Sequence, residues 1–228
     1  MGLLEQPEIL YTDNHLLVIG KPAGFLSQGD ITGDSDVITW CKLYLKETYN
    51  KKGNVYAGLV HRLDRPASGV MVIARTSKAA SRLTAQWKRR VPVKRYLALV
   101  EGKVEGSGSW VDHIVKVDRR ASIVSNGHPA GKKAILSYSV ISSGDGLSCL
   151  DILLETGRPH QIRLQCSSRG FPILGDLRYG SERLFDGRNL ALHAYSLELE
   201  HPVKLEKMEF IWKKPLLKWE ALYPIFQP

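Results

Sequence analysis

Short apolar runs separated by turn-forming residues constrain the fold of this chain most. Residues 69–74 read GVMVIA, and this length and composition predict a buried strand. Residues 8–21 carry two β-type runs around the turn formers Asp13 and Asn14. Further strands are predicted over residues 94–100, in short pieces up to 140, and over 147–155, 190–199 and 207–212. Strands therefore dominate, and the pattern predicts an α+β fold on a mixed, largely antiparallel sheet flanked by helices and loops.

Three segments between these runs have helical patterns. Residues 36–49 place one apolar stripe on a helix, made of Val37, Trp40, Cys41 and Leu45. Ser77 is the expected N-cap of a second helix that runs to about Arg89 and shares one face among Ala80, Leu83 and Trp87. Pro159 is expected in the first turn of a short third helix that Gly170 ends.

Composition limits the class of protein. The chain has 228 residues, of which 43% are hydrophobic and 24% are charged, so it is long enough to bury a core. It has no Ser/Gly-rich linker and no repeat, which predicts a single domain over residues 1–228. No apolar run approaches the roughly 20 residues of a membrane span, and the start lacks a basic secretory n-region. We therefore expect a soluble, cytoplasmic protein without a membrane partner, and a monomer.

Cysteine and histidine usage gives no support for a disulfide framework or a metal site. The three cysteines are widely separated, and the seven histidines show neither HxH nor HExxH spacing. We expect three reduced, mostly buried thiols and no bound metal. A phosphate-binding GxxxxGK loop and a GxGxxG fingerprint are also missing, so no cofactor is predicted.

The positive charge of the chain points to a polyanionic partner. Lys and Arg number 32 against 23 Asp and Glu, a net charge of +9. Between residues 75 and 95 there are basic residues and no acid: Arg75, Lys78, Arg82, Lys88, Arg89, Arg90, Lys94 and Arg95. A solvated helix face is the simpler explanation, but such a face usually interleaves acids. The stripe therefore favours a surface that contacts nucleic-acid phosphates, through Lys78, Arg82, Lys88 and Arg89.

Three other segments are hard to explain as scaffold. HRLD, residues 61–64, places Asp64 before a loop that leads into a buried strand, although Asp64 could simply pair with Arg62 or Arg65. GRPHQIRLQ contains Arg163 near the start of the third helix, where it shares a face with His160 and Ser167. An arginine so placed can hold a carboxylate, or it can be an exposed residue of a basic protein.

A tyrosine at residue 96 lies in the third segment, KRYLALVEG. Strand alternation puts Tyr96 on the same side as Lys94 and Ala98, and a tyrosine in a strand is usually part of the core.

In this order and spacing, these segments resemble the RluA family of RNA pseudouridine synthases over nearly the whole chain. ILYTDNHLLVIGKPAG, FPILGDLRYG and LALHAYSLELEHP are similar to further family segments. The resemblance implies a pseudouridine-synthase-type catalytic domain that isomerises uridine in ribosomal or transfer RNA. It implies that Asp64 is the catalytic aspartate, that Tyr96 lies in the active site and that Arg163 contacts the aspartate.

The same resemblance implies how the chain treats its substrate. The uridine is expected to flip into a pocket, because a stacked base cannot reach a buried carboxylate. Ile162 is then an apolar wall for the base, Arg62 fills the vacated space, and His61 contacts the RNA backbone. Tyr96 stacks on the uracil and assists removal of the C5 proton.

Two features depart from the family pattern, and two other functions compete. The family often has a hydroxyl residue where Ala67 stands, and an N-terminal S4-type RNA-binding domain is not expected here. A non-catalytic RNA-binding module would explain the basic charge. A carboxylate-dependent nucleoside glycosidase would explain Asp64, although such hydrolases use two carboxylates.

Overall fold

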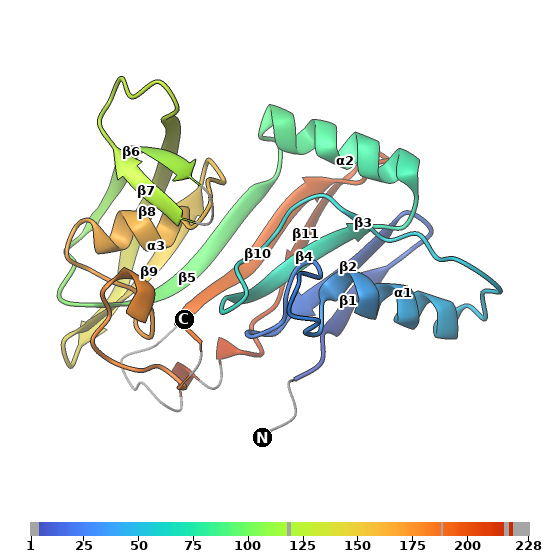
Figure 1. Cartoon of the computed structure of the whole chain (residues 1–228), viewed down its shortest axis with the longest axis horizontal. Coiled ribbons are helices and arrows are strands. Elements are labelled where there is room, and N and C mark those ends of the chain that lie inside the picture. Colours follow the sequence, from blue (N-terminus) through green and yellow to red (C-terminus); the bar gives the residue numbers. More distant parts are fainter. Residues whose placement is uncertain (1–4, 118–119, 188, 217–218, 221–228) are drawn as a thin grey trace. The chain divides into compact units, whose positions relative to one another are not determined.

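The computed structural model describes residues 5–117, 120–187, 189–216 and 219–220. The contacts within the chain divide it into two compact units. Unit 1 consists of residues 1–92 and 196–212, and unit 2 of residues 93–195 and 213–228. Strand β10 (Leu192–Glu200) belongs to unit 2 up to Tyr195 and to unit 1 from Ser196. Each unit is described in turn below, with the elements labelled in Figure 1.

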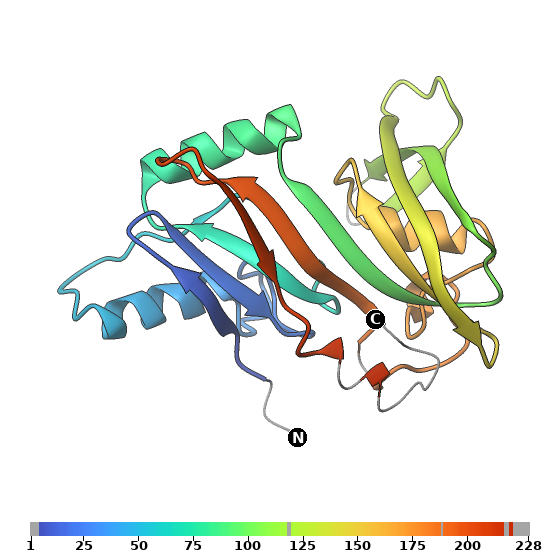
Figure 2. The same cartoon turned by 180° about the vertical axis from the view of Figure 1, so that it is seen from behind.

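Unit 1 is built on antiparallel strands. Strands β1 (Glu8–Thr12), β2 (Leu16–Lys21) and β4 (Ser68–Ala74) lie in the order β1-β2-β4-β10. The short strand β3 (Gly58–Leu59) pairs with β4, and β11 (Lys207–Ile211) pairs with β10, the pair nearest the viewer in Figure 2. The turn between β1 and β2 forms where the sequence predicts it. There the Asp13 carboxylate accepts hydrogen bonds from the backbone N–H groups of His15 (2.8 Å) and Leu16 (2.7 Å).

Two capped helices complete unit 1. Helix α1 (Val37–Thr48) begins after Asp36, whose carboxylate accepts from the N–H groups of Ile38 and Thr39. Helix α2 (Ser77–Arg89) has Thr76 as its N-cap, because the Thr76 hydroxyl accepts from Ala79 N–H at 3.1 Å. The predicted bounds of both helices are confirmed, but Ser77 as N-cap is wrong by one residue.

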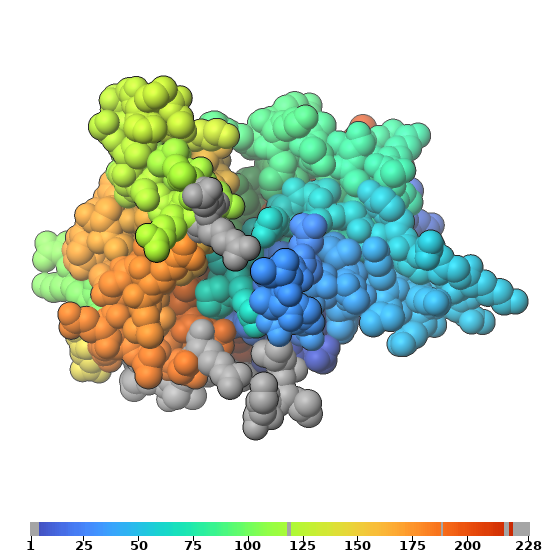
Figure 3. Space-filling view, viewed as in Figure 1, coloured from blue at the N-terminus to red at the C-terminus, as the bar shows by residue number. Residues whose placement is uncertain are grey.

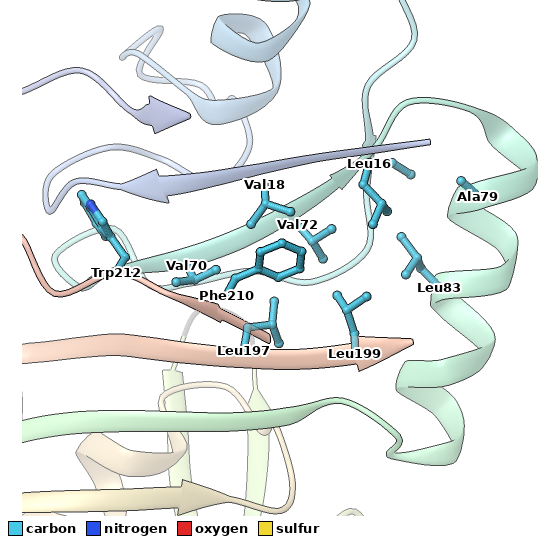
Figure 4. Close-up of a cluster of buried hydrophobic side chains, with 11 residues drawn as sticks. Leu16, Val18, Val70, Val72, Ala79, Leu83, Leu197, Leu199, Phe210 and Trp212 are labelled. Atoms are coloured by element: carbon cyan, nitrogen blue, oxygen red, sulfur yellow. The ribbon is translucent and has the colours of Figure 1, made fainter. Parts of the chain in front are cut away.

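The core of unit 1 forms because β2 and β4 alternate their side chains between two buried faces. One face joins apolar side chains of β2, β4, β10 and β11 to the inner face of α2 (Figure 4). The cluster contains Leu16, Val18, Val70, Val72, Ala74, Ala79, Leu83, Leu197, Leu199, Phe210 and Trp212. Gly20 admits the Trp212 indole, since a Cβ at residue 20 would lie 2.4 Å from the Trp212 ring.

Unit 2 carries the second set of antiparallel strands, in the order β5-β9-β8-β6-β7. Their bounds are β5 (Val93–Glu101), β6 (Ser107–Val117), β7 (Arg120–Val124), β8 (Lys132–Gly144) and β9 (Leu147–Leu154). A short helix α3 (Gln161–Ser167) packs on β6 and β7, and a 3-10 turn η1 (Leu177–Tyr179) packs on α3. The predicted strands at 94–100 and 147–155 are confirmed to within one residue, whereas the short strands predicted up to residue 140 are longer in the structure, and β8 extends to Gly144.

The start of α3 differs from the prediction. His160 is the N-cap and has a left-handed backbone conformation with φ of 52°, so the helix begins at Gln161. Pro159 therefore lies outside the helix, and its predicted place in the first turn is wrong. The left-handed residue turns the chain sharply into α3.

The three cysteines are buried thiols, as expected. Cys41 lies in unit 1, and Cys149 and Cys166 lie in unit 2; none forms a disulfide. Burial raises the pKa of each thiol to about 12, which keeps all three protonated at neutral pH. Among the described residues, no helix is long and apolar enough to cross a membrane.

The α2 contact with the core gives a test of this packing. Leu83 is fully buried, and Thr84 beside it is exposed. We expect Leu83→Ala to lower the free energy of unfolding by about 2–4 kcal/mol, because it removes apolar contacts and leaves a cavity. Thr84→Ala should change it by less than about 0.5 kcal/mol. Urea unfolding measures both, and an equal effect of the two substitutions would contradict the assigned face.

Candidate functional site

The loop that carries Asp64 is fixed within unit 1. It connects β3 to β4, and Asp64 itself is partly exposed. The residue before it, Leu63, is held by Ser27, whose hydroxyl donates to the Leu63 carbonyl (2.6 Å) and accepts from the Leu63 N–H (3.1 Å). On the other side, the Ala67 N–H donates to the Asp64 carbonyl at 3.1 Å. Hydrogen bonds on both sides of Asp64 therefore fix the backbone of the loop.

A buried lysine, Lys21, also donates a hydrogen bond to the backbone of this loop. The Lys21 Nζ atom is fully buried and donates to the carbonyls of Pro22 (3.0 Å), Phe25 (2.8 Å) and Arg65 (3.2 Å). Three acceptors match the three hydrogens of an ammonium group. Burial lowers the pKa of Lys21 to about 7, the charge of Asp64 opposes this shift, and that of Arg65 adds to it. The sequence indicated only a turn here, although a lysine directly after an apolar strand was a usable signal.

Arg65 has its own partners next to Asp64. Its guanidinium pairs with Asp34 at 2.9 Å and donates to the Gly24 carbonyl at 3.1 Å. Gly24 in turn donates its N–H to the Arg65 carbonyl at 2.8 Å. These bonds tie the residue 21–25 turn to the Asp64 loop, while Arg62 is exposed.

His61, at the start of the loop, packs inside unit 1. Its Nε2 atom accepts a hydrogen bond from the Val72 N–H at 3.0 Å, so this nitrogen carries no proton. Its ring stacks on Trp87 with centroids 4.8 Å apart. His61 therefore links the loop to β4 and α2, and its predicted contact with the RNA backbone stays a prediction.

Arg163 is the buried cation of unit 2. Its Nε and Nη2 atoms donate to the two oxygens of Asp176, at 2.6 and 2.7 Å. Both side chains are buried, with exposed fractions of 7% and 1%. The alternative of an exposed arginine is therefore wrong. The bidentate contact fixes the plane of the guanidinium and uses one of its edges.

Asp176 was missed as a functional candidate, although it lies in the FPILGDLRYG segment. Gly175 before it has φ of 86°, and a Cβ there would lie 2.4 Å from the Asn189 carbonyl, so the turn requires glycine. The Asp176 carbonyl accepts from the N–H groups of Tyr179 and Ser181. The turn that presents the carboxylate is thus held by its own backbone.

Tyr179 contacts each of the three residues of the predicted polar face of α3. Its hydroxyl lies 2.6 Å from His160 Nδ1, its ring centroid lies 4.8 Å from the Arg163 guanidinium carbon, and its carbonyl accepts from the Ser167 hydroxyl at 2.6 Å. The prediction that His160, Arg163 and Ser167 share one face is confirmed, even though His160 lies outside the helix. Nothing in the sequence pattern predicted that a tyrosine covers this face.

The two other predicted pocket residues of unit 2 are buried. Tyr96 lies in β5 opposite Ile152 of β9 and is 8% exposed. Ile162 lies in α3 and is 4% exposed. Among the described residues, no group of three or more His, Cys, Asp or Glu side chains could hold a metal ion.

The two ends of the basic stripe have partners within the protein. At its ends, Arg75 donates to Thr12 (3.0 Å) and Tyr49 (3.1 Å), and Arg95 pairs with Asp151 in a contact supported by Tyr195. Both arginines therefore contact groups of their own units, although the Arg95 side chain is 41% exposed. The outer side of α2 stays at the surface of unit 1 (Figure 3), with exposed Lys78, Arg82, Lys88 and Arg89. Of these, Arg82 also donates to the Pro202 carbonyl at 2.8 Å.

Comparison with known proteins gives the family. Residues 15–168 match the family described as RNA pseudouridylate synthase. Over 227 residues, the chain is 35% identical to the ribosomal large subunit pseudouridine synthase D of Pseudomonas aeruginosa, covering 92% of this chain and 68% of that protein. It is 30% identical over 219 residues to the uncharacterized RNA pseudouridine synthase YlyB of Bacillus subtilis, covering 92% and 71%.

Solved structures show the same fold. The human RNA pseudouridylate synthase domain containing 4 matches with a TM-score of 0.81 at 24% identity, over 97% of this chain and 94% of that one. The human RNA pseudouridylate synthase domain containing 1 matches with a TM-score of 0.76 at 25% identity, over 100% and 91%.

The chain therefore belongs to the RluA family of RNA pseudouridine synthases. Its α+β fold on a mixed, largely antiparallel sheet is that of the family. It is an isomerase that converts uridine to pseudouridine in RNA, and the comparisons do not favour a non-catalytic RNA-binding module.

The buried pair of unit 2 gives a second prediction. Asp176→Asn should lower the free energy of unfolding by about 3 kcal/mol, because it removes the charge of the buried carboxylate to which the Arg163 guanidinium makes two hydrogen bonds. Asp34→Asn is the matched control, since the Asp34 and Arg65 side chains are each 44% exposed, and it should cost less than about 1 kcal/mol. Urea unfolding compares the two variants; equal losses would show that burial does not govern the Asp176 contact.

Lys21 gives a third prediction, with a definite sign. Between pH 7 and about 10 the unfolded chain holds a proton on Lys21 that the folded chain has released, so stability should rise with pH in this window. In Lys21→Met this contribution is absent. The free energy of unfolding of the wild type should therefore increase relative to the variant as the pH is raised. A constant difference between them would mean that Lys21 keeps its proton in the folded protein.

Proposed function

We propose that this chain isomerises uridine in large-subunit ribosomal RNA and that Asp64 is the essential carboxylate. The observation that carries the proposal is the fixed Asp64 loop inside the segment that matches the family. The choice of RNA is supported by the names of relatives from Pseudomonas aeruginosa and Nitrosomonas europaea, each a ribosomal large subunit pseudouridine synthase D at 35% identity.

The reaction needs a carboxylate and a shielded pocket. The N1–C1′ bond of the uridine breaks, the detached uracil turns, a C5–C1′ bond forms, and the C5 proton is lost. No electron is gained or lost overall and no water is consumed. Asp64 acts either as a nucleophile or as the base that removes the C2′ proton, and both roles require its ionised form.

Arg163 is the proposed partner of the Asp64 carboxylate. Asp176 accepts hydrogen bonds from Nε and Nη2 of Arg163 and so holds its guanidinium in one orientation. A cation held in this fixed orientation stabilises an ionised carboxylate in a water-poor pocket. The proposal thus requires Asp64 of unit 1 and Arg163 of unit 2 to act on one nucleotide, as a single catalytic domain over residues 1–228.

The remaining predicted residues are proposed to handle the flipped nucleotide. Tyr96 stacks on the uracil and helps remove the C5 proton, and Ile162 is an apolar wall. Arg62, which is exposed, fills the space that the base leaves, and His61 borders the backbone. The exposed cations of α2, Lys78, Arg82, Lys88 and Arg89, bind phosphates around the target. A cytoplasmic, monomeric protein belongs to the same proposal.

Substitution of Asp64 tests the assignment directly. Asp64→Asn keeps the size of the side chain but removes its charge, so the release of tritium from 5-labelled uridine in ribosomal RNA should fall by at least about 10³-fold. RNA binding by the variant should stay within a factor of about two, because the phosphate contacts lie elsewhere.

Asp34→Asn is the control for loss of one acid near the loop, and it should leave turnover unchanged. An Asp64→Asn enzyme that still releases tritium would refute the catalytic assignment. Release of free uracil by the wild type would instead favour the glycosidase. Mapping of pseudouridine in total RNA, with and without the protein, identifies the modified uridine.

A further inference from the structure

A hollow in unit 2 is lined by two arginines. It has a volume of about 450 Å³, and its walls are Arg120, Ala121 and Ser122 of β7 on one side and Arg178 and Tyr179 of η1 on the other. Arg120 and Ser122 are exposed, whereas Ala121 is buried in the small core of this unit. The hollow is therefore open to solvent above a packed floor.

The chemistry of these walls suits an anion. The two guanidinium groups carry two positive charges, the Ser122 hydroxyl can donate a hydrogen bond, and none of the described residues that line the hollow is acidic. Strand β7 is also the last strand in the order of unit 2, so part of its backbone N–H groups lies outside the ladder. Arginine binds phosphate oxygens in a bidentate manner, and hydroxyl and N–H groups add further donors.

The wall formed by η1 is rigid and adjoins Arg163. Tyr179 is fixed through its hydroxyl, its carbonyl and its N–H group, by His160, Ser167 and Asp176 respectively. Its ring centroid lies 4.8 Å from the guanidinium carbon of Arg163 and 5.6 Å from that of Arg178. A ligand in the hollow is thus held beside the cation that the proposed reaction uses.

We propose that the hollow between β7 and η1 binds a backbone phosphate of the RNA substrate, through Arg120, Arg178 and Ser122. This inference rests on the proposed function, since it assigns a position on unit 2 to the polyanion on which the enzyme acts. The hollow would be a phosphate contact additional to those proposed for the cations of α2. The run of basic residues 75–95 did not predict it. Polyanion binding here is expected to be electrostatic and independent of the base sequence.

The test uses the full chain and large-subunit ribosomal RNA transcribed in vitro. Arg120→Gln with Arg178→Gln should raise the Kd for this RNA roughly tenfold at low salt, and it should reduce the slope of log K against log salt by about one. At saturating RNA, tritium release should stay within a factor of about two. Lys103→Gln is the matched charge control in the same unit, since Lys103 is 79% exposed, and it should leave the salt slope unchanged.

Three results would overturn the proposal. In the first, the double variant binds RNA with the same Kd and salt slope as Lys103→Gln. In the second, inorganic phosphate shifts the Ser122 amide resonance of the wild type but RNA binding is unaffected by the substitutions, so that the hollow takes only a small free anion. In the third, circular dichroism shows that the double variant is folded while its RNA affinity equals that of the wild type.

Failure of this proposal and failure of the proposed function give different results. If Asp64→Asn remains active, the catalytic assignment fails, although a salt-dependent loss of binding in the arginine variants would still support the phosphate site. If the arginine variants bind normally while Asp64→Asn is inactive, the phosphate site fails and the catalytic assignment stands. Single variants Arg120→Gln and Arg178→Gln should each give part of the effect, because both cations contact one phosphate.

Discussion

The buried contact between Arg163 and Asp176 is the constraint on which the rest of unit 2 depends. A guanidinium removed from water needs a counter-charge, and Asp176 supplies two oxygens in the geometry that arginine prefers. The turn that carries Asp176 is held by its own backbone hydrogen bonds, and it requires glycine at residue 175 because of the positive φ and the nearby Asn189 carbonyl.

Unit 1 also contains a buried basic side chain, and its hydrogen-bond acceptors are backbone carbonyl oxygens. Lys21 is fully buried, and its amine donates hydrogen bonds to three backbone carbonyl groups. In unit 2 the Arg163 guanidinium donates instead to the carboxylate of Asp176. One of the three backbone carbonyls belongs to Arg65, the residue after Asp64. The lysine therefore acts on the loop that carries Asp64 through the backbone of that loop. Two buried cations thus order the two segments that the family resemblance marks as functional.

Local sequence was sufficient for much of the fold. Alternation and β-branched composition located β4 and β5, and the apolar stripes of α1 and α2 located their inner faces at Cys41 and Leu83. The N-cap of α2 did not follow from local sequence, because threonine and serine both favour this position. Thr76 is the N-cap because its hydroxyl accepts the hydrogen bond from the Ala79 N–H. The helix at Pro159 was misplaced because a left-handed His160 has no strong signature in sequence.

The sequence by itself determined the family, the strand-rich fold and the identity of the candidate residues Asp64, Tyr96 and Arg163, because these depend on residue type and on order along the chain. Only the tertiary structure decided which charges are used internally. It gave Arg75 and Arg95 partners within their own units, gave Arg163 the partner Asp176, and placed Arg120 and Arg178 around one hollow. The reason is physical: an ion pair depends on distance in space, and these partners are separated by many residues in sequence.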